Sequence, residues 1–395
     1  MYKKLILIIF LTFMVFLIPE FSISQENYED SKLMDRFLQE QLDNLNIEEL
    51  ELVLEDVFRS GDIDYPKIKI KDAIISAING EKILSFNEIL AAIFDLFLWE
   101  IRDNLILIIQ IFAITIAFAL LTNLASSFQR GDVVQLAQYA CYTILTMVTI
   151  NSFTLALELG KRTVVQMVDF MQIILPILLS LLTLISGPNT RLLFHPIILA
   201  SMGIIASIVK NLIFPLILFS FIMGIIGNIS EKVPFSQLSE LMRQIILGIV
   251  AGSLTIFIGV ITIFGMGSKV DGISIRTAKF AVDNLVPIVG KFLSDAVETV
   301  VSCSAILKNG IGLVGLLILF LICIIPIIKI VTLILSYKVI SAIAQPIVSE
   351  NTIKFFNEVG KGLLLIMVGV LSVGTMFFIT IAMVVELGNA TIMLR

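Results

Sequence analysis

Charged residues are scarce in this sequence, and so is histidine, the residue from which many catalytic and metal sites are built. Only 15% of its 395 residues are charged, and it has a single histidine, His195. A soluble domain has about 25% charged residues, so the composition excludes an ordinary soluble globular protein. It also excludes a disordered chain, because 58% of the residues are hydrophobic and disorder requires low hydrophobicity with high charge.

The spacings that characterise enzyme and metal sites are missing as well. The sequence contains no HExxH motif and no GxxxxGK[ST] loop, and one histidine cannot form a metal cluster. No nucleophile occurs together with a base and an orienting partner. Cys141, Cys303 and Cys323 stand apart in apolar surroundings, which predicts buried free thiols. We therefore expect neither an enzyme nor a bound metal or cofactor.

The charges that are present are unevenly distributed along the chain. Residues 25–104 carry 19 acidic and 8 basic side chains, whereas residues 105–395 carry 12 acidic and 17 basic ones. No segment is basic enough to indicate a nucleic-acid partner. The pattern predicts an all-α protein, with a polytopic membrane domain over 104–395 preceded by a small acidic helical region over 25–103.

The acidic region carries clear helix signals. Residues Ile47–Arg59 place apolar side chains at helical spacing, and Glu48 and Glu49 favour the start of that helix. A capping box at Ser85–Glu88 predicts the start of a second helix. We expect a small extracytoplasmic helical domain that docks on its own membrane region or on a partner, with its acidic charge on a solvated face.

Seven apolar segments are long enough to cross a bilayer, whose hydrocarbon core requires about 20 apolar residues. They are residues 104–123, 135–158, 164–187, 197–228, 245–267, 311–336 and 363–386. The fourth would be about 48 Å long as a helix and contains Lys210 and Pro215, which predicts either a tilted, kinked helix or a broken hairpin. The positive-inside rule does not orient the later loops, because basic residues are nearly equal on the two sides.

The two halves of the membrane domain share a pattern. Arg162-Thr163 and Val168-Asp169 recur 114 positions later as Arg276-Thr277 and Val282-Asp283. In each half, an apolar segment containing a lysine, a polar stretch with a proline and a span containing glycine then follow in the same order. This order indicates an internal repeat, which is common in transport folds.

Residues 268–310 differ from an ordinary loop. Lys291, Asp295, Glu298 and Ser302 recur at spacings of 4, 3 and 4 and therefore share one face of a helix, with apolar residues on the other side. Such a helix lies in the membrane interface, re-enters the membrane or lines a polar passage. Its polar face is a candidate lining or docking surface.

Other candidate residues lie inside the predicted spans. A charge within a span is costly and indicates a functional role, which makes Asp169, Lys210 and Lys329 candidates. Lys329 could also reach the interface by extending its side chain. Gly248 and Gly252 form a GxxxG spacing, which favours close helix packing within the protein or between copies.

Several stretches resemble the stage III sporulation protein AE family of endospore-forming bacteria. They are Gly80-Glu81-Lys82, Met167–Leu182, Arg276–Asp295 (RTAKFAVDNLVPIVGKFLSD) and Lys308-Asn309-Gly310. Arg276–Asp295 is the most specific of them, and the similarity covers nearly the whole chain. The resemblance implies a multi-pass protein of the mother-cell membrane around the forespore, in a transenvelope channel complex needed for late forespore gene expression.

The resemblance also implies partners. These are the other proteins of the same operon, including ring-forming subunits and a secretion-type ATPase, and a forespore protein called Q. The family has no established catalytic residues to carry over. Two functions fit: a membrane core or scaffold of the channel complex, which could be a homo-oligomer, or a permease that moves a small solute or ion.

Residues 1–24 predict a cleaved signal peptide. Two lysines precede the apolar run Leu5–Ile18, which is about 21 Å long as a helix and too short for the ~30 Å hydrocarbon core. Ser22 and Ser24 supply the small residues that precede a cleavage site. N-terminal sequencing of the mature protein should begin at Gln25, which would place the acidic region outside the cytoplasm. An intact N-terminal methionine would contradict the prediction.

Overall fold

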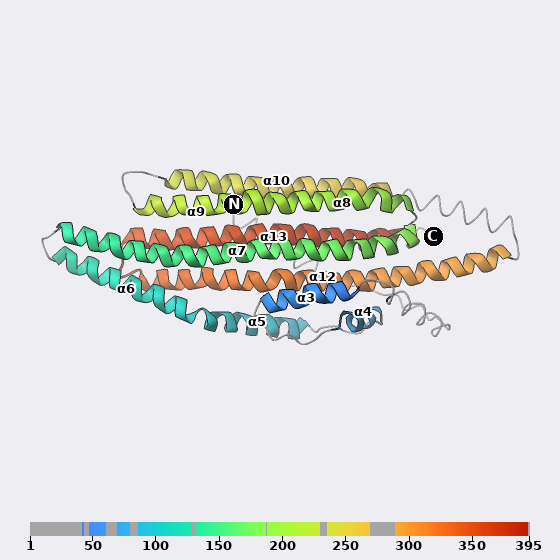
Figure 1. Cartoon of the computed structure of the whole chain (residues 1–395), viewed down its shortest axis with the longest axis horizontal. Coiled ribbons are helices and arrows are strands. Elements are labelled where there is room, and N and C mark those ends of the chain that lie inside the picture. Colours follow the sequence, from blue (N-terminus) through green and yellow to red (C-terminus); the bar gives the residue numbers. More distant parts are fainter. Residues whose placement is uncertain are drawn as a thin grey trace.

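The structure is a computed structural model that describes residues 42, 47–60, 69–79, 86–127, 131–186, 188–229, 235–268 and 289–393. Every regular element in these ranges is helical (Figure 1), which confirms the predicted all-α class. The helices are α3 (Ile47–Ser60), α4 (Ile70–Ile78), α5 (Phe86–Asp103), α6 (Leu105–Ser127), α7 (Gly131–Ser186), α8 (Pro188–Ile208), the π-helical turn η1 (Val209–Ile213), α9 (Phe214–Ile229), α10 (Ser236–Ser268), α12 (Val289–Ala344) and α13 (Glu350–Met393).

The longest helices lie side by side along the long axis of the molecule (Figure 1). Helices α7 and α12 contain 56 residues each, so each is about 84 Å long. That length is nearly three times the ~30 Å thickness of a hydrocarbon core. Both helices therefore reach well beyond the apolar layer of a bilayer.

Helix α13 occupies the centre of the bundle. It contacts α7 and α12 on one side and α8, α9 and α10 on the other (Figure 1). In its most apolar segment 89% of the residues are buried inside the protein, compared with 22% in α10. Helix α13 is thus the core element, and α10 is peripheral.

The outer helices present apolar side chains to the surroundings. Ile106, Ile204, Ile256 and Ile263 are each between 60% and 70% exposed, and an apolar surface of this kind is compatible with lipid rather than with water. Within the described ranges, five helical segments are long and apolar enough to cross a membrane, or up to six when the pair α5–α6, bent by 47°, is counted as one span. The chain is therefore a helical membrane protein.

The structure joins two of the predicted spans. The break expected between 135–158 and 164–187 is absent, because α7 continues through both. The polar stretch from Glu158 to Arg162 suggested a loop, but it contains no proline to end a helix. A Cβ atom on Gly160, in this stretch, would lie 2.8 Å from Ile366 on α13, so the stretch packs against the core as helix. The predicted count of seven spans is not confirmed.

The fourth predicted span is a continuous rod rather than a hairpin. The turn η1 joins α8 directly to α9. Residues Pro196–Gly227 together form one helical segment that is long and apolar enough to cross a membrane. Pro215 lies two residues after this π-helical turn, and a proline has no backbone N–H to give to the preceding turn. The wider turn at Lys210 and Asn211 accommodates this loss. Of the two forms that the sequence predicts, the broken hairpin is not found, and the tilt and kink of the single helix stay predictions.

The N-terminal helices pack on the membrane bundle. Helix α3 confirms the helix predicted at Ile47–Arg59, and α4 lies against α12 while α3 contacts α7. Glu51 accepts a hydrogen bond from the backbone N–H of Ile70 at 3.0 Å, which joins α3 to α4. A Cβ atom on Gly310 would lie 2.8 Å from Ile78, so this glycine lets α4 approach closely. The region docks on its own chain, and its extracytoplasmic location stays a prediction.

The segment predicted as amphipathic or re-entrant is partly described. From residue 289 onward it is helical and continues without interruption into the apolar part of α12. Residues 269–288, which include the second copy of the repeated pattern, lie outside the described ranges. The internal repeat therefore stays a prediction, as do the signal peptide and Ser85 of the capping box.

The packing of α13 predicts a sharp difference between two neighbouring glycines. A Cβ atom on Gly362 would lie 2.7 Å from the ring of Phe153 and 3.2 Å from that of Phe221, and these two rings stack 3.6 Å apart. Gly362→Ala should therefore lower the free energy of unfolding by about 1–3 kcal/mol, the usual cost of overpacking. Denaturant titration in mild detergent would measure it.

The matched control is Gly360→Ala, two residues earlier on the same helix. A Cβ atom on Gly360 meets nothing within 4 Å, and alanine is a better helix former than glycine. This variant should be as stable as the wild type or slightly more stable. Equal losses of stability in the two variants would show that α13 is not packed as described.

Candidate functional site

A polar cluster joins α9, α10 and α13 at one end of the bundle. Arg243 on α10 is only 3% exposed and forms an ion pair with Glu358 on α13. Its guanidinium group also donates to Glu240 at 3.4 Å and to the hydroxyl of Ser239 at 3.0 Å. The hydroxyl of Ser239 donates to the backbone carbonyl of Ser220 on α9 at 2.9 Å. These five residues and Lys361 are called the Arg243 cluster below.

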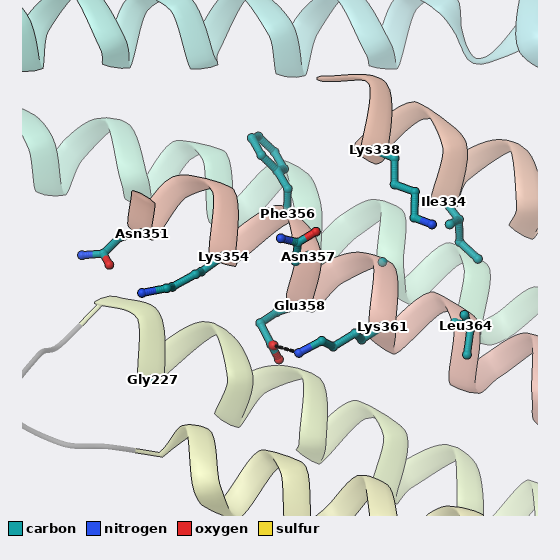
Figure 2. A pocket seen from close by; sticks show the side chains of 11 residues that line it. Gly227, Ile334, Lys338, Asn351, Lys354, Phe356, Asn357, Glu358, Lys361 and Leu364 are labelled. Atoms are coloured by element: carbon teal, nitrogen blue, oxygen red, sulfur yellow. Dashed lines mark hydrogen bonds and ion pairs between the residues drawn. The ribbon is translucent and has the colours of Figure 1, made fainter. Parts of the chain in front are cut away.

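Local helix geometry brings the charges together. Glu240 and Arg243 are three residues apart on α10, as are Glu358 and Lys361 on α13, and this spacing places each acid beside a base. Lys361 contacts Glu358 at 2.8 Å (Figure 2). The two-pronged guanidinium of Arg243 can contact two carboxylates at once. The cluster thus links α10 to α13 through a charge that would be costly to bury alone.

Gly224 on α9 makes room for this cluster. A Cβ atom there would lie 2.6 Å from a carboxylate oxygen of Glu358 and 3.3 Å from the guanidinium of Arg243. A larger residue would push apart the two charged groups that α9 covers. The absence of a side chain at this position is therefore part of the site.

A half-open cavity of about 630 Å³ lies beside the Arg243 cluster, between α9, α12 and α13 (Figure 2). Its lining combines lysines, asparagines and apolar residues: Gly227, Ile334, Lys338, Asn351, Lys354, Phe356, Asn357, Glu358, Gly360, Lys361 and Leu364. It lies at the end of the bundle where α12 turns back into α13, which we call the hairpin end. Three lysines against one carboxylate give the wall a positive charge.

Lys329, one of the predicted intramembrane charges, has a partner in the structure. Its ammonium group lies 3.8 Å from the carboxylate of Glu100 on α5, and the two side chains are 22% and 7% exposed. Asn104 donates to the same carboxylate at 2.9 Å. Lys329 therefore ties α5 to α12 through a largely buried ion pair, and whether it reaches the membrane interface stays a prediction.

Lys308, in the last of the stretches that carry the sequence resemblance, is completely buried. Its ammonium group donates to the backbone carbonyl of Val385 and to the side-chain oxygen of Asn389, the latter at 3.3 Å. Both acceptors are on α13. Lys308 therefore joins α12 to α13. Gly310, two residues later on α12, lets α4 pack closely against the same helix.

The remaining predicted charges are differently placed. Asp169 on α7 and Lys210 on η1 are both exposed, so the structure gives them no partner in the interior. The side chains of Lys291, Asp295 and Glu298 lie outside the described part of the chain, and Ser302 is half-buried on α12. A shared polar face of these four residues stays a prediction.

The predicted packing glycines face open space. A Cβ atom on Gly248 or Gly252 would meet no other atom within 4 Å, and both residues are exposed on α10. They do not mediate contacts within the described part of this chain. Packing between copies, the other alternative open at the sequence level, stays a prediction.

Sequence reasoning missed the residues that the structure brings together. Arg243 and Glu358 lie 115 positions apart, and each adjoins an apolar run, so each looked like the polar end of a span. Glu100 lies four residues before the predicted span at 104 and was assigned to the acidic region. The sequence contains one signal of this site: an acidic residue precedes a basic residue by three positions twice, at Glu240 and Arg243 and again at Glu358 and Lys361.

The described polar side chains hold helices together and line the cavity. No group of three or more His, Cys, Asp or Glu side chains that could hold a metal ion occurs among the residues whose positions are described. Cys303 and Cys323 are buried thiols that form no disulfide, and the side chain of Cys141 lies outside the described part of the chain. The chemistry that the cavity offers is positive charge beside amide and apolar groups.

Comparison with known proteins identifies the family. A family model described as stage III sporulation protein AE matches residues 68–388. A Bacillus subtilis (strain 168) protein described as "Stage III sporulation protein AE" is 34% identical over 326 residues, which is 82% of each chain. No solved structure matches.

A double-mutant cycle should detect the Arg243–Glu358 contact. Arg243→Met and Glu358→Gln, alone and together, should give a coupling free energy of unfolding of about 1–3 kcal/mol, because both groups are largely desolvated. The exposed pair Glu350–Lys354, with 79% and 55% exposure, provides the control. Its cycle should show almost no coupling. Additive effects at Arg243 and Glu358 would refute a shared, buried ion pair.

Proposed function

Because this chain belongs to the stage III sporulation protein AE family, we propose that it is a sporulation-specific membrane core of a transenvelope channel complex. The complex links mother cell and forespore and is needed for late forespore gene expression. In this proposal the chain is multi-pass in the mother-cell membrane around the forespore, with residues 25–103 extracytoplasmic. Ring-forming subunits, a secretion-type ATPase and the forespore protein Q are its partners, and it is not an enzyme.

The observation that carries the scaffold proposal is the closed interior around α13. Several hydroxyl groups occur along this helix, and a permease would need such groups free to bind a solute. Here they are engaged by carbonyl oxygens of their own helix: Ser372 with Gly369, Thr375 with Leu371 and Thr380 with Met376. The one donor of each of these hydroxyls is therefore used within the helix, and only its lone pairs remain for a solute.

An apolar layer also closes the bundle where α7, α12 and α13 meet. The sulfur atoms of Met167 and Cys323 are 3.3 Å apart, and a Cβ atom on Gly374 would lie 2.7 Å from the sulfur atom of Cys323. Such spacing leaves no room for a water molecule between the three helices. This supports a passage formed by several subunits over one that runs through a single chain.

One observation favours the alternative, a permease for a small solute or ion. The buried hydroxyl groups of Tyr142 and Thr146 on α7 and of Thr332 on α12 have no hydrogen-bond partner among the residues that the structure describes. They lie between the hairpin end and the apolar layer, where a short polar path could begin. The layer at Met167 and Cys323 blocks its continuation in this conformation, so the scaffold is the better supported function.

The outer face of α10 is the surface on which we propose that subunits meet. Gly248 and Gly252 are open there, and Ile245 and Ile256 beside them are exposed. In lipid, small residues let two helices approach closely enough for packing to hold them together. The face suits another copy or a membrane partner.

Co-purification from sporulating cells would test the proposal. Tagged wild-type protein should recover the ring-forming subunits and further copies of itself. Gly248→Leu/Gly252→Leu should reduce that recovery several-fold, because leucine side chains hold the helices apart. Gly203→Leu, at an open position on α8, serves as the control and should leave recovery unchanged.

Two outcomes would count against the scaffold. One is undiminished recovery of partners by the double variant, which would remove α10 from the interface. The other is flux of a small solute or ion into vesicles that contain only this chain, measured against empty vesicles. Flux by the chain alone would favour the permease, whereas a scaffold leaves the vesicles tight.

A further inference from the structure

We propose that the cavity at the hairpin end binds the headgroup of an anionic phospholipid, with the acyl chains running along α12 and α13. This inference does not depend on the proposed role in a channel complex. It rests on the charge, shape and position of the cavity. Its volume of about 630 Å³ lies within the range of roughly 300–1,000 Å³ that is usual for small-ligand sites.

The charge of the cavity suits a phosphate group. Lys338, Lys354 and Lys361 line it from α12 and from two turns of α13 (Figure 2). Lys354 is also paired with Glu350 at 2.9 Å on the exposed side of α13. The one carboxylate in the lining, Glu358, is already engaged by Arg243 and Lys361. Lys338 forms no ion pair with a described carboxylate and is exposed. Its positive charge is therefore available to an anion.

The polarity of the cavity changes along the bundle axis. Asn351 and Lys354 lie near the turn between α12 and α13, the ammonium group of Lys338 lies further along beside Ile334, and Leu364 lies at the far side of the cavity (Figure 2). The apolar run of α13 begins at Leu363, directly after Lys361 and Gly362. A ligand that fits this arrangement has a charged end at Lys338 and an apolar end toward the spans, as a phospholipid does.

The surface next to the cavity is suited to lipid. Leu335 and Val339, on either side of Lys338 on α12, are 41% and 43% exposed, which is compatible with acyl chains. Basic pockets between helices at the membrane surface are established sites for acidic headgroups. Free inorganic phosphate would use the lysines but would leave the apolar part of the cavity without a role.

Native mass spectrometry of the purified full-length chain in mild detergent would test the inference. Titration with dioleoyl phosphatidylglycerol should show one retained lipid per chain, while dioleoyl phosphatidylcholine at the same concentration should show much less. Lys338→Gln/Lys354→Gln should weaken the phosphatidylglycerol adduct about thirtyfold, because each lysine near an anionic lipid contributes roughly fivefold. These two substitutions leave Arg243, Glu358 and Lys361 intact.

The control removes the same amount of charge elsewhere. Lys161→Gln/Lys210→Gln alters two lysines of the spanning helices that lie outside the cavity, and it should bind phosphatidylglycerol like the wild type. Equal losses in both double variants, or equal binding of the two lipids, would overturn the assignment. Displacement of phosphatidylglycerol by millimolar inorganic phosphate would also overturn it and make free phosphate the ligand.

Discussion

Close packing around α13 is the constraint on which the rest of the structure depends. In lipid there is little hydrophobic drive between helices, so their association relies on contact at short range. Glycines provide that contact: a Cβ atom on Gly312 would meet Val385, one on Gly315 would meet Ile174, and one on Gly374 would meet Cys323. The smallest side chains therefore lie where α12 and α13 approach their neighbours most closely.

An enclosed central helix also determines where charge can be tolerated. Arg243 with Glu358, Lys329 with Glu100, and Lys308 with the carbonyl group of Val385 each satisfy a buried charge by contact between two helices. An unpaired charge at these depths would be strongly destabilising. The charges inside the bundle thus hold helices together, whereas Lys338 at the hairpin end is left available to a ligand.

Much of the architecture follows from sequence pattern, but contacts between distant segments do not. Helical periodicity correctly predicted α3, and the apolar runs predicted the membrane helices. The break within α7 was predicted wrongly because a polar stretch resembles a loop unless its contact with α13 is known, and Gly160 makes that contact. Glu100 and Lys329 are 229 positions apart, and no local spacing reveals such a pair.

The most direct test of this account is a structure of the purified assembly in a lipid nanodisc, with the bilayer and ordered water resolved. The account predicts that α13 is enclosed within each copy, that the layer at Met167, Cys323 and Gly374 is dry, and that any aqueous passage is bounded by more than one subunit. A continuous water-filled path through a single copy would contradict it.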